Sequence, residues 1–128
     1  MTKKPKRIGL IDGKFHPCPK SPNCVSTQSS DEKHKIEPIK YEGGLEEAKS
    51  KIITIIKSLK RSKIITETEN YLHIEFRTAV WRFVDDVEFF FDDTEKIIHF
   101  RSAARLGYSD LGVNRKRMEN IKELYLKA

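Results

Sequence analysis

The stretch RFVDDVEFFFDDTEKIIHFRS, residues 82–102, decides the fold of this chain. Val87, Phe89 and Phe91 recur at every second position, which is the side-chain period of a β-strand. The run KIIHFRS repeats this alternation after the polar DDTEK, whose composition is typical of a turn. β-Branched and aromatic residues dominate both runs. The stretch therefore predicts two strands joined by a tight turn.

Two further strands are expected before this pair. KIITETENYLHIEFRT, residues 63–78, has the composition of a short strand, a turn near Glu69 and Asn70, and a strand over 71–79. Because the connections are short, the four strands are expected to form an antiparallel meander.

Helical periodicity flanks the strands on both sides. LEEAKSKIITIIKSLKR predicts a helix over 44–61, and NRKRMENIKELYLK predicts a last helix with Asn114 as its N-cap. Residues 1–43 are rich in proline and glycine and are expected to be loop. The predicted fold class is α+β, a four-stranded antiparallel meander with two helices packed on one face and a long N-terminal loop segment.

Composition limits the domain count and the partners. The 128 residues are 38% hydrophobic and 34% charged, which suits one soluble domain, predicted over 15–128 after a basic flexible tail over 1–14. The net charge is +6, but residues 1–20 hold six basic residues against Asp12 and supply +5 of it. The body is thus nearly neutral, so no nucleic-acid partner is expected.

No apolar run approaches the roughly 20 residues of a membrane span, and no secretory signal is evident. A cytoplasmic location with reduced cysteines is therefore expected.

The strand alternation sorts side chains onto two faces. One face carries apolar residues such as Leu72, Ile74 and Phe100, which are expected to meet the helices. The other face collects His73, Glu75, Arg77, Asp86, Glu88, His99 and Arg101. The favoured interpretation is a solvated face with weak ion pairs, because charged residues opposite a core face are common. The alternative is a charged cleft floor covered by the N-terminal loop.

The loop CPKSPNCVST, residues 18–27, is stiffened by two prolines. Cys24 or Ser26 could act as a nucleophile, although no spacing ties a histidine to either. A zinc site from His16, Cys18, Cys24 and His34 matches no usual ligand spacing, so no metal and no cofactor are predicted. A rigid loop with packed thiols is favoured, and a disulfide is expected only if the protein is exported or oxidised.

The stretch RSAARLGYSDLGVNRKR, residues 101–117, combines arginines, glycines and a helix start. Guanidinium groups and free helix amides suit a carboxylate or a phosphate. The equally favoured alternative is that Asp85, Asp86 or Asp110 pairs with the arginines internally and fixes the loop.

These segments, together with YLHIEFRT and FVDDVEFFFD, resemble the domain-of-unknown-function family numbered 1499, in order from Phe15 to Leu126. The family's cysteine loop falls on Cys18 to Ser26, and its arginine segment falls on Arg101 to Arg115. Thr27 and Ala104 stand where the family usually has serine. The resemblance implies that the motifs form one unit, and it implies no reaction.

Three hypotheses follow. The first is a binding domain for a small anionic ligand, with a polar cleft formed by the cysteine loop and the arginine loop. The second is an enzyme that uses Cys24 or Ser26 as its nucleophile. The third is a protein-interaction domain with a structural arginine loop, in which Lys3 to Arg7 dock on an acidic partner. The predicted ligand-binding residues are Arg101, Ser102, Arg105, Ser109, Asp110, Asn114, Arg115, Cys24, Ser26, Asp85 and Asp86.

Overall fold

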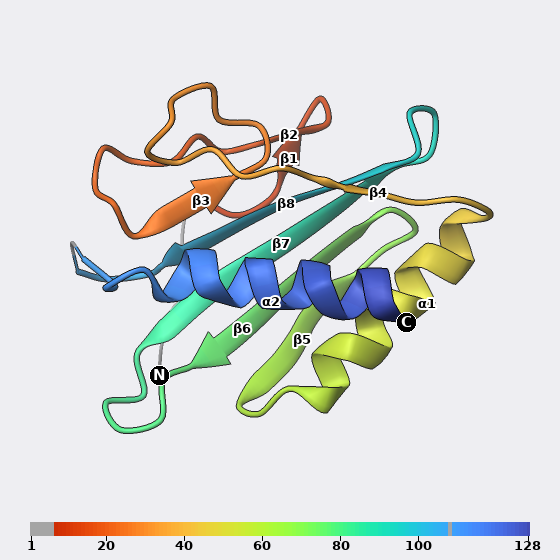
Figure 1. The fold of residues 1–128 in the computed structure, drawn as a ribbon. Helices are drawn as coiled ribbons and strands as arrows, with labels where there is room; N and C mark the ends of the chain where they lie inside the picture. The colour runs from red at the N-terminus through yellow and green to blue at the C-terminus, as the bar shows by residue number, and fades with distance from the viewer. Residues whose placement is uncertain (1–6, 108) are drawn as a thin grey trace.

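The computed structural model describes residues 7–107 and 109–128 (Figure 1). Two helices and a four-stranded meander occupy the predicted places in the chain. Their bounds are α1 Leu45–Ser58, β5 Ser62–Glu67, β6 Tyr71–Arg77, β7 Val84–Asp92, β8 Ile97–Ala104 and α2 Val113–Lys127. Each neighbouring pair of these strands is antiparallel. The α+β class and the meander are confirmed.

The predicted sheet of four strands is too small. Two short strands, β3 (Cys24–Ser26) and β4 (Ile39–Lys40), pair with successive parts of β8 and extend the sheet to six strands. The strand β8 also continues through Ala104, past the end that the sequence predicted. Without these partners, the outer edge of β8 would carry unpaired backbone donors and acceptors, which short N-terminal strands satisfy here.

A separate hairpin lies N-terminal to the sheet. Its strands are β1 (Leu10–Ile11) and β2 (Lys14–Phe15), joined by Asp12 and Gly13 with φ angles of 53° and 75°. An Asp-Gly pair with two positive φ angles is the usual two-residue hairpin turn. Part of the predicted tail over 1–14 therefore has regular structure, whereas its residues 1–6 lie outside the described residues.

The hydrophobic core lies between the helices and the apolar face of the sheet, as the alternation predicted (Figure 1). From the sheet, Leu72, Phe89 and Phe100 are 0% exposed. They pack with Ile52 of α1 and Met118 of α2, which are also 0% exposed. Within the part of the chain that the structure describes, neither helix has the length and apolar character needed to cross a membrane.

Candidate functional site

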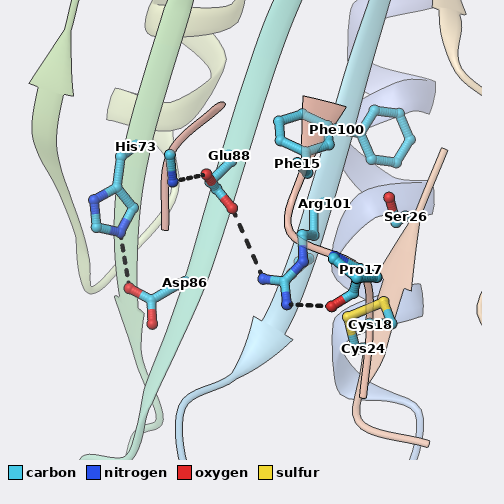
Figure 2. A network of polar contacts seen from close by, with 12 residues as sticks. Phe15, Pro17, Cys18, Cys24, Ser26, His73, Asp86, Glu88, Phe100 and Arg101 are labelled. Atoms are coloured by element: carbon cyan, nitrogen blue, oxygen red, sulfur yellow. Dashed lines mark hydrogen bonds and ion pairs between the residues drawn. A yellow bond between two sulfur atoms is a disulfide. The ribbon is translucent and has the colours of Figure 1, made fainter. Parts of the chain in front are cut away.

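The centre of the charged face is buried, whereas Glu75, Arg77 and His99 are half-buried, so the favoured expectation of a solvated face is wrong at its centre. His73 and Glu88 are 0% exposed, and Asp86 and Arg101 are 3% exposed. The N-terminal segment covers them, because the backbone N–H of Gly9 donates to Glu88 Oε2 at 2.8 Å (Figure 2). The strand alternation thus identified the residues of this face, and the alternative interpretation had named the N-terminal loop as its cover.

The carboxylate of Asp86 lies at the centre of a paired cluster. It accepts from His73 Nε2 at 2.8 Å, and Arg105 donates to both of its oxygens at 3.0 and 2.6 Å. Burial favours the neutral acid, but the hydrogen bonds from His73 and Arg105 outweigh burial and hold the pKa of Asp86 below its usual value. A second carboxylate, Glu75 Oε2, accepts from Arg105 at 2.8 Å. Two carboxylates therefore surround Arg105, and they raise its pKa.

The neighbouring Arg101 has much poorer partners. Its Nη1 lies 3.8 Å from Glu88 Oε1, and its Nη2 donates to the carbonyl of Pro17 at 3.5 Å (Figure 2). Among the described residues, Arg101 Nε has no hydrogen-bond partner, and the same holds for Arg105 Nη1. Burial lowers the pKa of Arg101, and the nearby carboxylates of Glu88 and Asp86 oppose that effect. Arg101 is thus a buried cation whose donors are only partly satisfied.

Glu88 is held by donors other than Arg101. The hydroxyl of Tyr71 donates to its Oε2 at 2.5 Å, in addition to the bond from Gly9. Burial and the Glu88 carboxylate together raise the pKa of Tyr71. The candidate residues from the sequence did not include Tyr71. Its place two residues before His73 in one strand was the signal that could have found it.

A pocket of about 390 Å³ lies beside these arginines. Arg101, Arg105 and Asp86 contribute to its wall from the sheet side, and Pro19 and Ser21 contribute from the cysteine loop. Asn23 joins the two loops, because its side-chain N–H donates to the carbonyl of Gly107 at 2.8 Å. The cysteine loop and the arginine loop are therefore neighbours, although they lie about 80 residues apart in the chain.

The expectation of reduced cysteines is wrong. Cys18 and Cys24 form a disulfide, with their Cα atoms 5.7 Å apart, and the described residues contain no free cysteine. The spacing of Cys18 and Cys24 could not show whether they are two free thiols or a disulfide, because that depends on how the loop folds. Cys24 has no thiol with which to act as a nucleophile in this structure, and neither cysteine can supply a zinc thiolate.

Several predicted residues lie on the opposite, helix-facing side of the sheet. Asp85 Oδ2 accepts from Arg117 at 2.7 Å, and Ser102 donates to Asn114 Oδ1 at 2.5 Å. Arg117 was outside the predicted set, although it belongs to the arginine stretch and also lies over the ring of Phe76. These contacts fix α2 to the sheet.

The predicted N-cap is wrong. The cap position of α2 is Gly112, with φ 81°, and Asn114 lies inside the helix. The carboxylate of Asp110 accepts from the backbone N–H groups of Gly112 and Asn114 at 2.8 and 2.9 Å. Burial opposes this charge, but the hydrogen bonds from Asn114 and Gly112 lower the pKa of Asp110. The helix amides assigned to a ligand are therefore already bound by a side chain of the protein.

The remaining predicted residues, Ser26, Ser109 and Arg115, do not line the pocket. Ser26 is buried and lies opposite Arg101 in the β3–β8 pair, and its Oγ accepts from the backbone of Gln28 at 3.2 Å. Ser109 is exposed, and Arg115 donates to the carbonyl of Lys33 at 3.2 Å, away from the pocket. The described residues contain no group of three or more His, Cys, Asp and Glu side chains suited to a metal ion.

The model of one family, described as Protein of unknown function (DUF1499), matches residues 14–124 of the 128-residue chain. Because the match covers more than half of the chain, the chain belongs to this family, and the resemblance carried by the loop motifs is confirmed. No curated protein matches the chain. The family description names no reaction, so the function has to be argued from the geometry of the site.

Proposed function

We propose that this member of the DUF1499 family binds a small carboxylate or phosphate compound in the pocket beside Arg101 and Arg105. The observation that carries the proposal is a buried guanidinium, Arg101, which lines a pocket and lacks a close carboxylate partner. A buried charge without full pairing is costly, and a bound anion would remove that cost.

The two arginines have different roles in this proposal. Arg105 is already engaged by Asp86 and Glu75, at distances of 2.6 to 3.0 Å. Arg101 has its nearest carboxylate oxygen at 3.8 Å and an unpartnered Nε. A guanidinium offers five N–H donors in a planar fork that suits two oxygens of one anion. Arg101 is therefore the proposed ligand-binding residue. Arg105 fixes the side chains of the pocket wall next to Arg101 and adds its Nη1 as a donor.

Glu88 does not cancel the charge of Arg101 fully. Its Oε2 accepts from Tyr71 and from the backbone of Gly9, whereas its Oε1, 3.8 Å from Arg101 Nη1, has no hydrogen bond among the described residues. The pocket volume of about 390 Å³ is in the range that small ligands occupy. Pro19 and Ser21 supply the opposite wall, on a loop that the disulfide closes.

The disulfide also bears on the cellular location. Structural disulfides persist in oxidising compartments and are rare in the cytosol. The bond between Cys18 and Cys24 therefore favours an oxidising compartment over the expected cytoplasmic one.

The test is isothermal titration of the oxidised protein with inorganic phosphate and with citrate. Wild type should bind at least one of them saturably, and Arg101→Met should remove the binding. Arg115→Met is the matched control, because Arg115 lies outside the pocket, and it should bind as wild type does. Arg101→Lys keeps the positive charge but loses the planar set of N–H donors. This variant should therefore bind the anion roughly tenfold more weakly than wild type.

Two results would overturn the proposal. One is the absence of any heat or thermal shift from wild type with both anions at millimolar concentration. The other is equal affinity in Arg101→Met and Arg115→Met. Circular dichroism of each variant separates a lost ligand site from a lost fold.

A further inference from the structure

Two loops of the structure present large apolar side chains to solvent. The first loop, residues 78–83, carries Val80, Trp81 and Phe83, which are 78%, 75% and 57% exposed. The second, described over 105–107 and 109–112, carries Leu106 and Leu111, which are 77% and 88% exposed. We call these five side chains the apolar tips. A soluble domain rarely concentrates apolar groups of this size in exposed loops without an interaction to cover them.

The two loops that carry the apolar tips lie at the same end of the sheet (Figure 1). The first loop leads into β7 at Val84, and the second follows β8 at Ala104. The antiparallel pairing brings these strand ends together, since the backbone N–H of Arg105 donates to the carbonyl of Val84 at 3.0 Å. Thr78 closes the base of the first loop through two hydrogen bonds with Phe83, each 2.9 Å long. The bases of the two loops are therefore neighbours, and the hydrogen bonds of Thr78 close the first loop.

The charge at this end is basic. Arg82 is exposed between Trp81 and Phe83, and Lys60 and Arg61 are exposed at the start of β5, next to the end of β6. Nearby carboxylates are engaged internally: Glu75 and Asp85 pair with arginines, and Asp110 accepts from helix amides.

The opposite end of the sheet is acidic. The β5–β6 turn contains Glu69, and the β7–β8 turn contains Asp93 and Glu95, all exposed, with Lys96 paired to Asp93 at 2.8 Å. Acidic residues also begin α1, at Glu46 and Glu47. The sheet therefore has one apolar and basic end and one acidic end, and an anionic surface would orient the protein with the apolar tips towards it.

We propose that this end of the sheet docks on the surface of an anionic lipid bilayer, with the apolar tips inserted at the headgroup level. Trp is favoured at membrane interfaces because it combines an apolar body with a polar N–H. Basic side chains at the same level are attracted by anionic headgroups, and insertion of apolar area adds to that attraction. A flat protein interface would gather its apolar groups on one continuous face, whereas here they project from two separate loops. The proposal does not depend on the anion pocket.

The chain supplies its own probe, because Trp81 is the single tryptophan of the sequence. Vesicles of phosphatidylcholine with phosphatidylglycerol should shift its emission to shorter wavelength and protect it from acrylamide. Vesicles of phosphatidylcholine alone should have a much smaller effect. Raising the salt to about 0.5 M should weaken binding to the anionic vesicles, because the charges at this end are exposed and screened.

Co-sedimentation with the anionic vesicles tests the individual side chains. The double variant Trp81→Ser, Leu106→Ser should reduce the partition coefficient about tenfold or more. The matched control is Leu126→Ser, since Leu126 is 67% exposed but lies at the far end of α2. This control, and Arg101→Met from the pocket test, should sediment as wild type does.

The proposal is overturned if anionic vesicles leave the Trp81 emission unchanged, or if the double variant and Leu126→Ser sediment equally. It is also overturned if analytical ultracentrifugation without lipid detects a dimer that the double variant abolishes, because the apolar tips would then meet a second copy of the chain. Retained vesicle binding in Arg101→Met, together with lost phosphate or citrate binding, would separate this surface from the proposed ligand pocket.

Discussion

The two faces of one sheet are buried by different chemistry. Phe89 points into the helix-covered core, whereas its neighbour Glu88 points towards the N-terminal segment and is equally buried, at 0% exposure. The neighbouring carboxylates Asp85 and Asp86 divide in the same way, one pairing with α2 and the other with His73 and Arg105. The alternation of the strand assigns each residue to a face. The segment that covers that face decides whether a buried side chain there needs apolar contacts or a charged partner.

This difference sets how each face responds to change. Burial of apolar area depends little on exact partners, so the helix-covered face loses stability in proportion to the area and volume removed. Buried charges need specific partners, so the loop-covered face loses most when one member of a pair is left alone. The predictions below test this contrast.

The largest effect is expected from removing one aromatic ring of the apolar face. Phe89 is 0% exposed, and Phe89→Ala should lower the free energy of unfolding by about 4 kcal/mol, because it leaves a cavity in the core. The matched change Phe90→Ala, on the half-buried residue that stacks on His99, should cost about 1 kcal/mol. Urea unfolding measures both. Equal losses would mean that the two faces contribute alike to packing.

The next largest effect is the stability lost when one of the neighbouring aspartates, Asp86 or Asp85, is removed. Asp86→Ala removes the partner of both His73 and Arg105 and should cost about 3 kcal/mol, because a buried guanidinium loses its closest anion. Asp85→Ala should cost less, about 2 kcal/mol, because Arg117 keeps its bond to Asn114 Oδ1 at 2.8 Å. The same urea experiment ranks them, and a larger loss from Asp85→Ala would contradict the assignment of Asp86 as the centre of the polar cluster.

The third prediction concerns the disulfide, whose removal should affect only the loop-covered face. Cys18→Ala with Cys24→Ala opens a short loop and should lower the free energy of unfolding by about 2 kcal/mol. Hydrogen exchange should rise around 18–24 and at the end of β8, which pairs with β3, and α2 should keep its protection. Wild type with the disulfide reduced should behave like the double variant. A loss of protection spread evenly over α2 would mean that the bond stabilises the whole domain.

Local patterns predicted most of the helix-covered half and little of the other half. Period-two alternation located β6, β7 and β8, and helical spacing located α1 and α2, because each pattern is a property of neighbouring residues. The strands β3 and β4 contain two or three residues, too few for any periodicity, and they exist because β8 has a free edge. The hairpin at Asp12 and Gly13 was signalled by that residue pair and was missed.

The candidate site was predicted as a set of residues rather than as an arrangement. Arg101, Arg105 and Asp86 do lie together on the loop-covered face, whereas Asp85, Ser102 and Asn114 lie across the sheet from them. Residue spacing within β8 already separates Arg101 from Ser102 onto opposite faces. Which of those faces would be closed by a loop, and which carboxylate would pair with which arginine, depends on contacts between distant segments.

The smallest effect is a difference in pH dependence between the two faces. Asp86 has a pKa below its unfolded value of about 4, since the hydrogen bonds of His73 and Arg105 outweigh burial. A carboxyl group with a lowered folded pKa contributes stability above its unfolded pKa and loses that contribution as the pH falls through the folded value. Asp86→Asn should therefore flatten the decline of unfolding free energy below about pH 4, relative to wild type. Phe89→Ala should shift the whole curve downward without changing its slope, because no titrating group is removed. Urea unfolding between pH 2 and pH 7 measures both curves, and parallel curves for wild type and Asp86→Asn would mean that Asp86 titrates alike in the folded and unfolded chains.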